Sequence, residues 1–216
     1  MDEKAVKDMV RTTYDLIAAS YQDTYSEIDA ADRRNFWGTF TNMCVGEKVL
    51  DMGCGNGDGT LFLLEKGLVP TGVDISHAMI DIACSKSDKI QWLEIDICNC
   101  PFPDNTFFGI VLSYTVNHLT DGMLSKVKRE VDRLLKNSGN LLLVFHVGDT
   151  DEIRPDPADS RWNIYYHYFT KEVLETVFSN YTEVSYSQRA SLDPSELIND
   201  KGFLTLQKNS DSGLRG

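Results

Sequence analysis

Short apolar runs and longer amphipathic stretches alternate along the chain from residue 48 onwards. The short runs predict strands, and apolar residues at helical spacing in the longer stretches predict helices between them. Strands that alternate with helices favour an α/β fold with a doubly wound, mostly parallel sheet and helices on both of its faces. The predicted strands are 48–52, 69–74, 90–97, 108–113 and 141–147, and the predicted helices are 58–66, 76–85 and 121–136.

The two flanks of this alternating region follow other patterns. Apolar residues at helical spacing predict one or two helices over 3–25, and an apolar face predicts a further short helix over 29–43. Residues 148–168 are polar at first and then rich in aromatic side chains, which is typical of a long functional loop. A helix over 170–178 and closing strands at 183–188 and 203–207 complete the predicted elements.

A chain of 216 residues favours a single domain. We expect this domain to span 1–208, and we expect the N-terminal helices at 1–44 to act as a lid. The core follows at 45–208 and carries an insertion loop at 148–169. The polar tail at 209–216 is expected to be flexible.

Composition and charge exclude several classes of protein. Hydrophobic residues make up 42% of the chain and the net charge is -12, so we expect no nucleic-acid partner, because nucleic-acid binders are normally basic. The longest apolar run, 141–145, is too short to cross a bilayer and the first residues lack a secretory signal, which predicts no membrane partner. The odd number of cysteines, five, favours the reducing cytoplasm over a disulfide framework. Cys98 and Cys100 have no second pair at zinc-like spacing, so we expect no metal site.

A glycine-rich turn directly follows the first predicted strand. Gly53, Gly55 and Gly57 can adopt positive φ, and they leave room for a ligand to approach the backbone amides and the start of the next helix. Asp74 ends the next strand about twenty residues later, where a carboxylate reaches the two hydroxyls of a ribose. The spacing indicates a nucleoside site at the carboxyl edge of the sheet.

Several features of this region go beyond a general nucleotide-binding pattern. Asp51 precedes the glycines, Cys54 and Asn56 fill the gaps between them, and Asp96 lies near the end of the third predicted strand. The third glycine also comes early for a dinucleotide fingerprint. In this ordered set of motifs the chain resembles the class I S-adenosylmethionine-dependent methyltransferases over nearly its whole length. The resemblance implies a Rossmann-like, seven-stranded sheet in which six strands are parallel and one is antiparallel.

The resemblance also implies roles for individual residues. The 51–57 loop would meet the methionine part of S-adenosylmethionine, Asp74 would bind its ribose hydroxyls, and Asp96 with Ile97 would meet its adenine. The opening helix and the end of the fourth strand would add contacts to this donor and to its product, S-adenosylhomocysteine. The implied donor-binding residues are Tyr14, Tyr21, Asp51, Gly53, Cys54, Gly55, Asn56, Gly57, Asp74, Ile75, Met79, Asp96, Ile97, Ser113 and Tyr114.

Histidines and one tyrosine are candidates for the catalytic step. His118 follows the fourth strand and matches a histidine often seen in the family, although a lone histidine more often serves packing. His146 ends the fifth strand and is expected to face the same crevice, and His167 in the aromatic loop is a further candidate. Tyr21 lies seven residues from Tyr14 on one helix face, where both rings would close over the donor or simply pack on the domain.

We therefore expect an enzyme that transfers a methyl group from S-adenosylmethionine to a small-molecule acceptor by in-line displacement. It would act as a monomer or a homodimer. Two alternatives stay open: an NAD-dependent oxidoreductase, which would use the same loop and acid, and a non-catalytic protein that binds the donor or a partner. The residues do not decide which acceptor atom receives the methyl group.

Overall fold

The computed structural model of the chain describes residues 2–191 and 200–210, with the backbone alone over 22–28. Its helices are α1 (Glu3–Phe36), α2 (Gly38–Met43), α3 (Asp58–Glu65), α4 (His77–Lys86), α5 (Asp121–Leu134) and α6 (Lys171–Val177), with a short 3₁₀ helix, η1 (Thr115–His118). Its strands are β1 (Lys48–Met52), β2 (Val69–Asp74), β3 (Gln91–Glu94), β4 (Phe107–Ser113), β5 (Leu135–His146), β6 (Asp151–Pro155), β7 (Asn163–His167), β8 (Tyr181–Arg189) and β9 (Lys201–Lys208).

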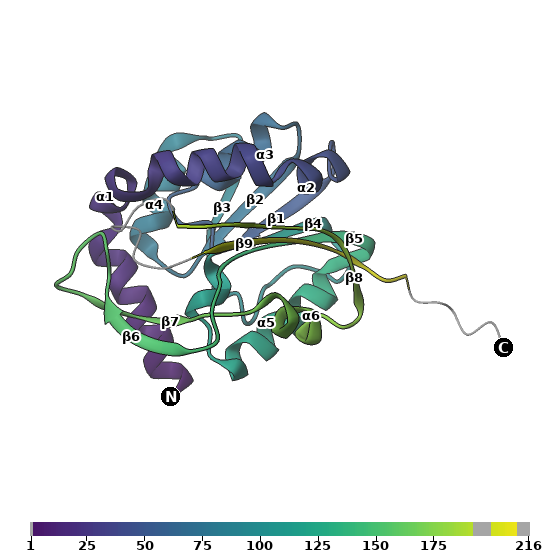
Figure 1. Ribbon diagram of the computed structural model, residues 1–216. Coiled ribbons are helices and arrows are strands. Elements are labelled where there is room, and N and C mark those ends of the chain that lie inside the picture. The colour runs from purple at the N-terminus through teal and green to yellow at the C-terminus, as the bar shows by residue number, and fades with distance from the viewer. Residues whose placement is uncertain (1, 192–199, 211–216) are drawn as a thin grey trace.

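A seven-stranded sheet in the order β3-β2-β1-β4-β5-β9-β8 forms the centre of the domain (Figure 1). β1 pairs in parallel with β2 and β4, β2 with β3, and β4 with β5. β9 is antiparallel to both of its neighbours, β5 and β8, so it is the one reversed strand of this sheet. The predicted α/β fold, with six parallel strands and one antiparallel strand, is confirmed.

The two faces of the sheet pack against different helices. On β5, Leu141 and Leu143 belong to a cluster with residues of α5 and α6, whereas Leu142 and Val144 belong to one with residues of α2 and α3. This period of two is expected of a strand that is covered on both faces. In Figure 1, α2 and α3 accordingly lie above the strands, and α5 and α6 lie below them.

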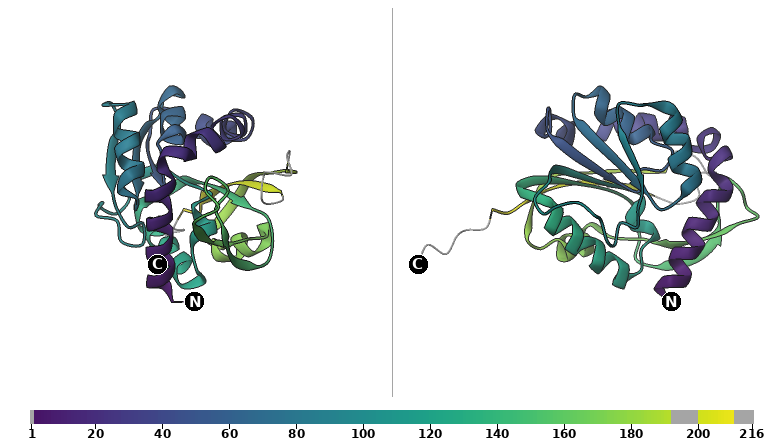
Figure 2. Two further views of the ribbon diagram at one scale, coloured as in Figure 1. Left: turned by 90° about the vertical axis from the view of Figure 1, so that its left-hand side faces the viewer. Right: turned by 180° about the vertical axis from the view of Figure 1, so that it is seen from behind.

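The N-terminal region forms one long helix where we predicted separate ones. α1 is continuous through the boundary between the predicted helices at 3–25 and 29–43, and α2 begins only at Gly38. No glycine or proline interrupts residues 3–37, so the sequence contains no strong signal that would end the helix earlier. α1 changes direction along its length: its first part runs beside α4 and β7, and its later part lies over α3 (Figure 2).

The segment predicted as an insertion loop, 148–169, contains a β-hairpin made of β6 and β7. Ile164, Tyr166 and Tyr168 form a cluster with residues of α1, whereas Tyr165 and Phe169 join the core on the other side. Side chains that alternate between two sides are typical of a strand. The number of aromatic residues alone, on which the loop prediction relied, does not reveal this alternation. The hairpin thereby fixes the first part of α1 against the domain.

Other element boundaries differ from prediction by a few residues. β3 ends before the predicted residue 97, because Asp96 accepts hydrogen bonds from the amides of Cys98 and Asn99 in a turn. β5 begins at Leu135 and includes the last residues of the predicted helix at 121–136. The predicted flexible tail lies outside the described residues from 211 onwards.

Candidate functional site

A cavity opens at the carboxyl ends of β1, β2 and β4, next to the first part of α1. It contains about 770 Å³ of empty space, part of it open to solvent, which is within the range of small-molecule sites. Its wall includes eleven of the residues predicted for the site: Tyr14, Tyr21, Gly53, Gly55, Asp74, Ile75, Asp96, Ile97, Ser113, Tyr114 and His118. It also includes residues that the sequence analysis missed, namely Lys7, Val10, Cys98, Thr115, Leu119 and Met123.

The glycines of the turn after β1 serve different purposes. Gly55 has a φ of 53°, and a Cβ placed on it would meet nothing within 4 Å, so its backbone faces open space. Gly57 has a φ of 85°, and a Cβ there would lie 2.8 Å from the ring of Trp92 and 2.9 Å from Ala83. Gly55 therefore leaves room in the cavity, whereas Gly57, which lies outside the cavity wall, is required by packing.

This difference predicts losses of stability of different size for two matched substitutions. We expect Gly57→Ala to lower the free energy of unfolding by about 2–3 kcal/mol, because it combines left-handed strain with overpacking. Gly55→Ala carries the strain alone and should cost about 1 kcal/mol. Urea denaturation of both variants tests the difference, and equal losses of stability would contradict it.

Asp74 is held with both of its oxygens in defined positions. The amide of Gly55 donates to Oδ2 at 2.8 Å, and the amide of Ser76 donates to Oδ1 at 2.9 Å. The side chain is buried, and burial raises its pKa. The hydrogen bonds from the two amides act in the opposite direction and lower it. Each oxygen keeps acceptor capacity beyond its amide bond, so the carboxylate can accept from two adjacent hydroxyl groups.

Asp96, which also lines the cavity, is paired with Lys7 of α1. The Lys7 Nζ lies 2.5 Å from Oδ2, and the amide of Cys98 donates to Oδ1 at 3.0 Å. Burial raises the pKa of Asp96, but the bonds from Lys7 and Cys98 outweigh burial and leave the pKa below its usual value. The carboxylate therefore remains charged at neutral pH.

A spacing in the sequence would have identified Lys7. Lys7, Tyr14 and Tyr21 follow one another at seven-residue intervals, which places them on one face of α1. All three line the cavity, and the rings of Tyr14 and Tyr21 lie 5.9 Å apart in an edge-to-face arrangement. A lysine on the same helix face as two tyrosines was thus the missed signal.

Tyr14 and His118 form a hydrogen-bonded pair in the cavity wall. His118 Nδ1 lies 2.8 Å from the carbonyl oxygen of Tyr165, so Nδ1 must carry the proton and donate it. Nε2 is then an acceptor, and the hydroxyl of Tyr14 donates to it at 2.8 Å. Burial lowers the pKa of His118 to about 4, so the imidazole is neutral at pH 7.

The shifted pKa of His118 predicts a loss of stability in acid. Between the usual pKa of 6.5 and the folded value of about 4, the unfolded chain binds a proton that the folded chain does not. The free energy of unfolding should therefore fall as the pH drops from 6.5 to 4. His118 accounts for roughly 2–3 kcal/mol of this loss. Urea titrations across this pH range measure how the free energy of unfolding changes with pH. This change should be smaller for His118→Asn than for the wild type, and an equal change would contradict the lowered pKa of His118.

Comparisons with known proteins agree on one family. A family model described as a methyltransferase domain matches residues 49–139. The demethylmenaquinone methyltransferase of Staphylococcus epidermidis is 32% identical over 149 residues, which cover 64% of this chain and 60% of that protein. The ubiquinone/menaquinone biosynthesis C-methyltransferase UbiE of Cronobacter sakazakii is 29% identical, with 91% of this chain and 83% of that protein covered. The chain belongs to the class I S-adenosylmethionine-dependent methyltransferases.

Solved structures share the fold of this methyltransferase-family chain. The crystal structure of Burkholderia thailandensis 1,6-didemethyltoxoflavin-N1-methyltransferase with bound 1,6-didemethyltoxoflavin and S-adenosylhomocysteine matches with a TM-score of 0.74. The match covers 97% of this chain and 92% of that chain at 16% identity, a level at which it shows the fold alone. The chain spans 60% of the length of the staphylococcal relative, so the reaction of that relative does not transfer to it directly. Membership of the family removes the oxidoreductase alternative.

The cavity of this methyltransferase-family chain fits the methyl donor of its family. Gly55 leaves open space beside the turn, and the Asp74 carboxylate offers two oriented oxygens to a ribose. Behind the turn, Asp51 Oδ2 accepts from Thr60 at 2.7 Å, while the buried Oδ1 has no hydrogen-bond partner among the described residues. Burial raises the pKa of Asp51 to about 6, as expected of an acid that lacks a compensating donor.

Five residues predicted to bind the donor do not line the cavity: Asp51, Cys54, Asn56, Gly57 and Met79. Their positions have structural explanations. The Oδ1 of Asn56 accepts from the amide of Asp58 at 3.2 Å, in the first turn of α3, and Met79 is on the buried face of α4. The turn thus presents part of its backbone to the cavity, while its side chains support the turn from behind.

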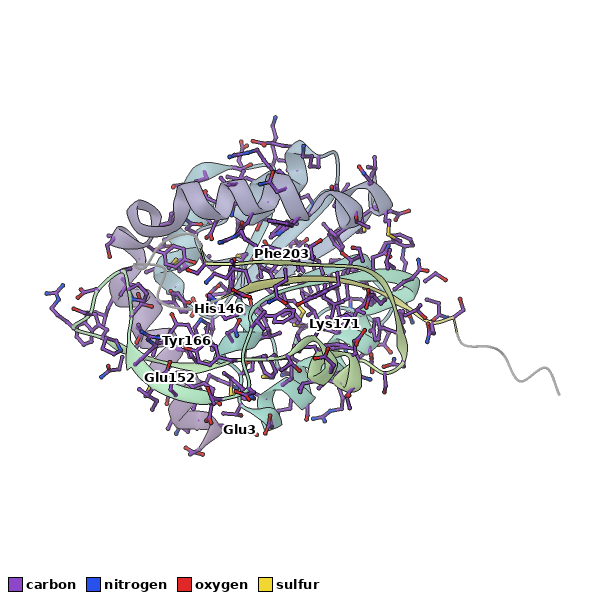
Figure 3. All side chains as sticks on the ribbon, viewed as in Figure 1. Glu3, His146, Glu152, Tyr166, Lys171 and Phe203 are labelled. Atoms are coloured by element: carbon purple, nitrogen blue, oxygen red, sulfur yellow. The ribbon has the colours of Figure 1, made fainter. Side chains whose placement is uncertain are left out.

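His146 does not line the cavity either, contrary to its predicted position in the crevice. Its Nδ1 accepts from the Nζ of Lys201 at 2.8 Å, and its ring stacks on Tyr114 with centroids 4.9 Å apart. Burial and the neighbouring Lys201 lower its pKa well below the usual value. Figure 3 shows His146 next to Tyr166, whose ring centroid lies 5.9 Å away. His146 therefore lies behind Tyr114, and His167 is similarly withdrawn, with Nδ1 3.1 Å from the carbonyl of Leu119.

Proposed function

We propose that this protein transfers a methyl group from S-adenosylmethionine to a small-molecule acceptor. The observation that carries the proposal is the Asp74 carboxylate, which the amides of Gly55 and Ser76 orient in the wall of the cavity. The names of the curated relatives support a small acceptor, since those proteins are quinone-biosynthesis methyltransferases. We further propose that one domain over 1–208 carries the activity.

Different residues of the cavity would contact different parts of the donor. Asp74 would accept from the ribose hydroxyls, Asp96 from the adenine amino group, and apolar Ile75 and Ile97 would contact the base. The backbone at Gly53 and Gly55 would hold the methionine part, with Ser113 and Tyr114 beside it. When bound, the donor supplies an electrophilic methyl group, and the main tasks of the chain are alignment and exclusion of water.

The Tyr14–His118 pair would orient the acceptor. The Tyr14 hydroxyl donates its proton to Nε2 of His118, so its oxygen would act toward the methyl acceptor as a hydrogen-bond acceptor for an N–H or O–H. His118 holds Tyr14 in place and is itself fixed by the carbonyl of Tyr165. Tyr21 packs edge-to-face on Tyr14 and would close the same part of the cavity.

A methyl-transfer assay tests this function. The protein would be incubated with S-adenosylmethionine carrying a labelled methyl group, together with reduced naphthoquinones and small aromatic amines as acceptors. We expect labelled product and S-adenosylhomocysteine to form in equal amounts and only when an acceptor is present. Binding of S-adenosylhomocysteine without transfer to any of these acceptors would favour the non-catalytic alternative.

Location and assembly are part of the same proposal. We propose a cytoplasmic protein that acts as a monomer or homodimer without a nucleic-acid or membrane partner. The net charge of -12 and five free cysteines support this location. Among the described helices, none has both the length and the apolar character that crossing a bilayer requires.

A further inference from the structure

Lys7 is a charged residue of the cavity wall that the proposed donor contacts leave without a role. It lies in the second turn of α1, on the face that also carries Tyr14 and Tyr21. Its Nζ is 2.5 Å from Oδ2 of Asp96, and among the described residues Asp96 is its one hydrogen-bond partner. An ammonium group carries three N–H donors, so the remaining donors of Lys7 are left for a ligand in the cavity.

Lys7 keeps its positive charge in this position. Burial lowers its pKa, but the hydrogen bond to Asp96 and the charge of that carboxylate outweigh burial and raise the pKa above its usual value. The Lys7 and Asp96 side chains are 30% and 37% exposed, so water screens the pair only in part. This part of the cavity wall thus presents a cationic donor directly beside an anionic acceptor.

A donor beside an acceptor matches an edge of adenine. The amino group of this base donates hydrogen bonds, and the ring nitrogens on either side of it, N1 and N7, accept them. The Asp96 carboxylate accepts from Lys7 and from the amide of Cys98, and it keeps lone pairs for the amino group. The Lys7 ammonium group, bonded to the same carboxylate, is then in position to donate to the neighbouring ring nitrogen.

Apolar side chains line the cavity next to this ion pair: Val10, Ile97, Leu119 and Met123. They belong to one apolar cluster or pack against it. Val10 lies one turn after Lys7 in α1, and Ile97 directly follows Asp96. Apolar walls with one polar edge suit an aromatic base, because its faces are apolar and its rim carries the hydrogen-bonding groups.

We infer that the ammonium group of Lys7 hydrogen-bonds to a ring nitrogen of the donor's adenine, next to the amino group that donates to Asp96. The inference rests on the proposed function, because it assigns a specificity-determining residue to the donor site. A role limited to the positioning of Asp96 would involve no ring nitrogen of the base. The two roles of Lys7 are therefore distinguishable by experiment.

Calorimetric titration of the full chain with S-adenosylhomocysteine and two of its deaza analogues tests the inference. In the 1-deaza and 7-deaza analogues, a C–H group replaces one of the ring nitrogens beside the amino group. We expect the wild type to bind one of these analogues at least about tenfold more weakly than S-adenosylhomocysteine, because that analogue cannot accept from the Lys7 ammonium group.

Lys7→Met replaces the ammonium group with an apolar side chain and leaves Asp96 in place. We expect this variant to bind S-adenosylhomocysteine about tenfold more weakly than the wild type and no longer to distinguish it from the sensitive analogue. Lys126→Met is the matched control, because Lys126 Nζ lies 2.5 Å from Glu3 and this exposed pair also joins α1 to α5. The control should keep the affinity of the wild type and its discrimination between the ligands.

Each other outcome has a distinct meaning. Failure of the wild type to bind S-adenosylhomocysteine would contradict the proposed function itself. Equal binding of all three ligands by the wild type would overturn only the role of Lys7, whether or not Lys7→Met folds. Discrimination that persists in Lys7→Met, with or without an equal loss of affinity for all three ligands, would limit Lys7 to the positioning of Asp96 or α1 and would also overturn the inference.

Discussion

Asp74→Ala is expected to weaken the binding of S-adenosylhomocysteine by at least about 100-fold, because hydrogen bonds to a charged group contribute about 1.5–3 kcal/mol each. The carboxylate is oriented before any ligand arrives, since the amides of Gly55 and Ser76 hold one oxygen each. The substitution removes both acceptors and leaves the two amides without them. Isothermal titration calorimetry of the variant and the wild type measures the effect directly.

Asp81→Ala is a suitable control for this prediction. Asp81 belongs to α4, and its side chain is 68% exposed beside His77. It should bind S-adenosylhomocysteine as the wild type does. A loss of less than about threefold for Asp74→Ala would show that this carboxylate does not bind the ribose, and an equal loss in both variants would indicate an indirect effect.

Asp32→Ala is expected to lower the free energy of unfolding by about 3–5 kcal/mol, the usual cost of breaking a buried ion pair from one side. The Asp32 and Arg189 side chains are 5% and 9% exposed, and two bonds of 2.7 Å join them. This pair connects α1 to β8, which lie far apart in the sequence. Removal of the carboxylate leaves the buried guanidinium without this countercharge.

Urea denaturation with circular dichroism detection measures this loss. Asp8→Ala is the control, because the pair of Asp8 with Arg11 is exposed and should contribute less than about 1 kcal/mol. If Asp32→Ala loses no more stability than this control, the Asp32–Arg189 ion pair does not stabilise the packing of the later part of α1.

The central sheet was predictable because its signals are local. β1, β2 and β4 combine apolar runs with turn residues at their ends, and Ser76 caps α4 as a serine before a helix is expected to do. Asp74 could be placed at the sheet edge because it ends a strand in a parallel arrangement. These features depend on residues that are near one another in the chain.

The features that could not be predicted depend on contacts between distant segments. Lys7 and Asp96 are separated by 89 positions, and only the direction of α1 brings them together. Tyr14 reaches His118 in the same way, across 104 positions. His146 was misplaced because the stacking of Tyr114 on its ring is a tertiary contact that the position of a residue at a strand end does not reveal. Pattern and spacing thus give the sheet, its ligand edge and the face that Tyr14 and Tyr21 share on the opening helix, but not the distant residues that this helix contacts.

Titration of the wild-type chain with S-adenosylhomocysteine and, separately, with NADH tests whether the cavity binds the methyl donor. We expect one saturable site for S-adenosylhomocysteine and no binding of NADH, because we propose that the cavity next to Gly55 and Asp74 holds the methyl donor. Binding of NADH in its place, or of neither ligand, would show that this cavity is not a site for the methyl donor.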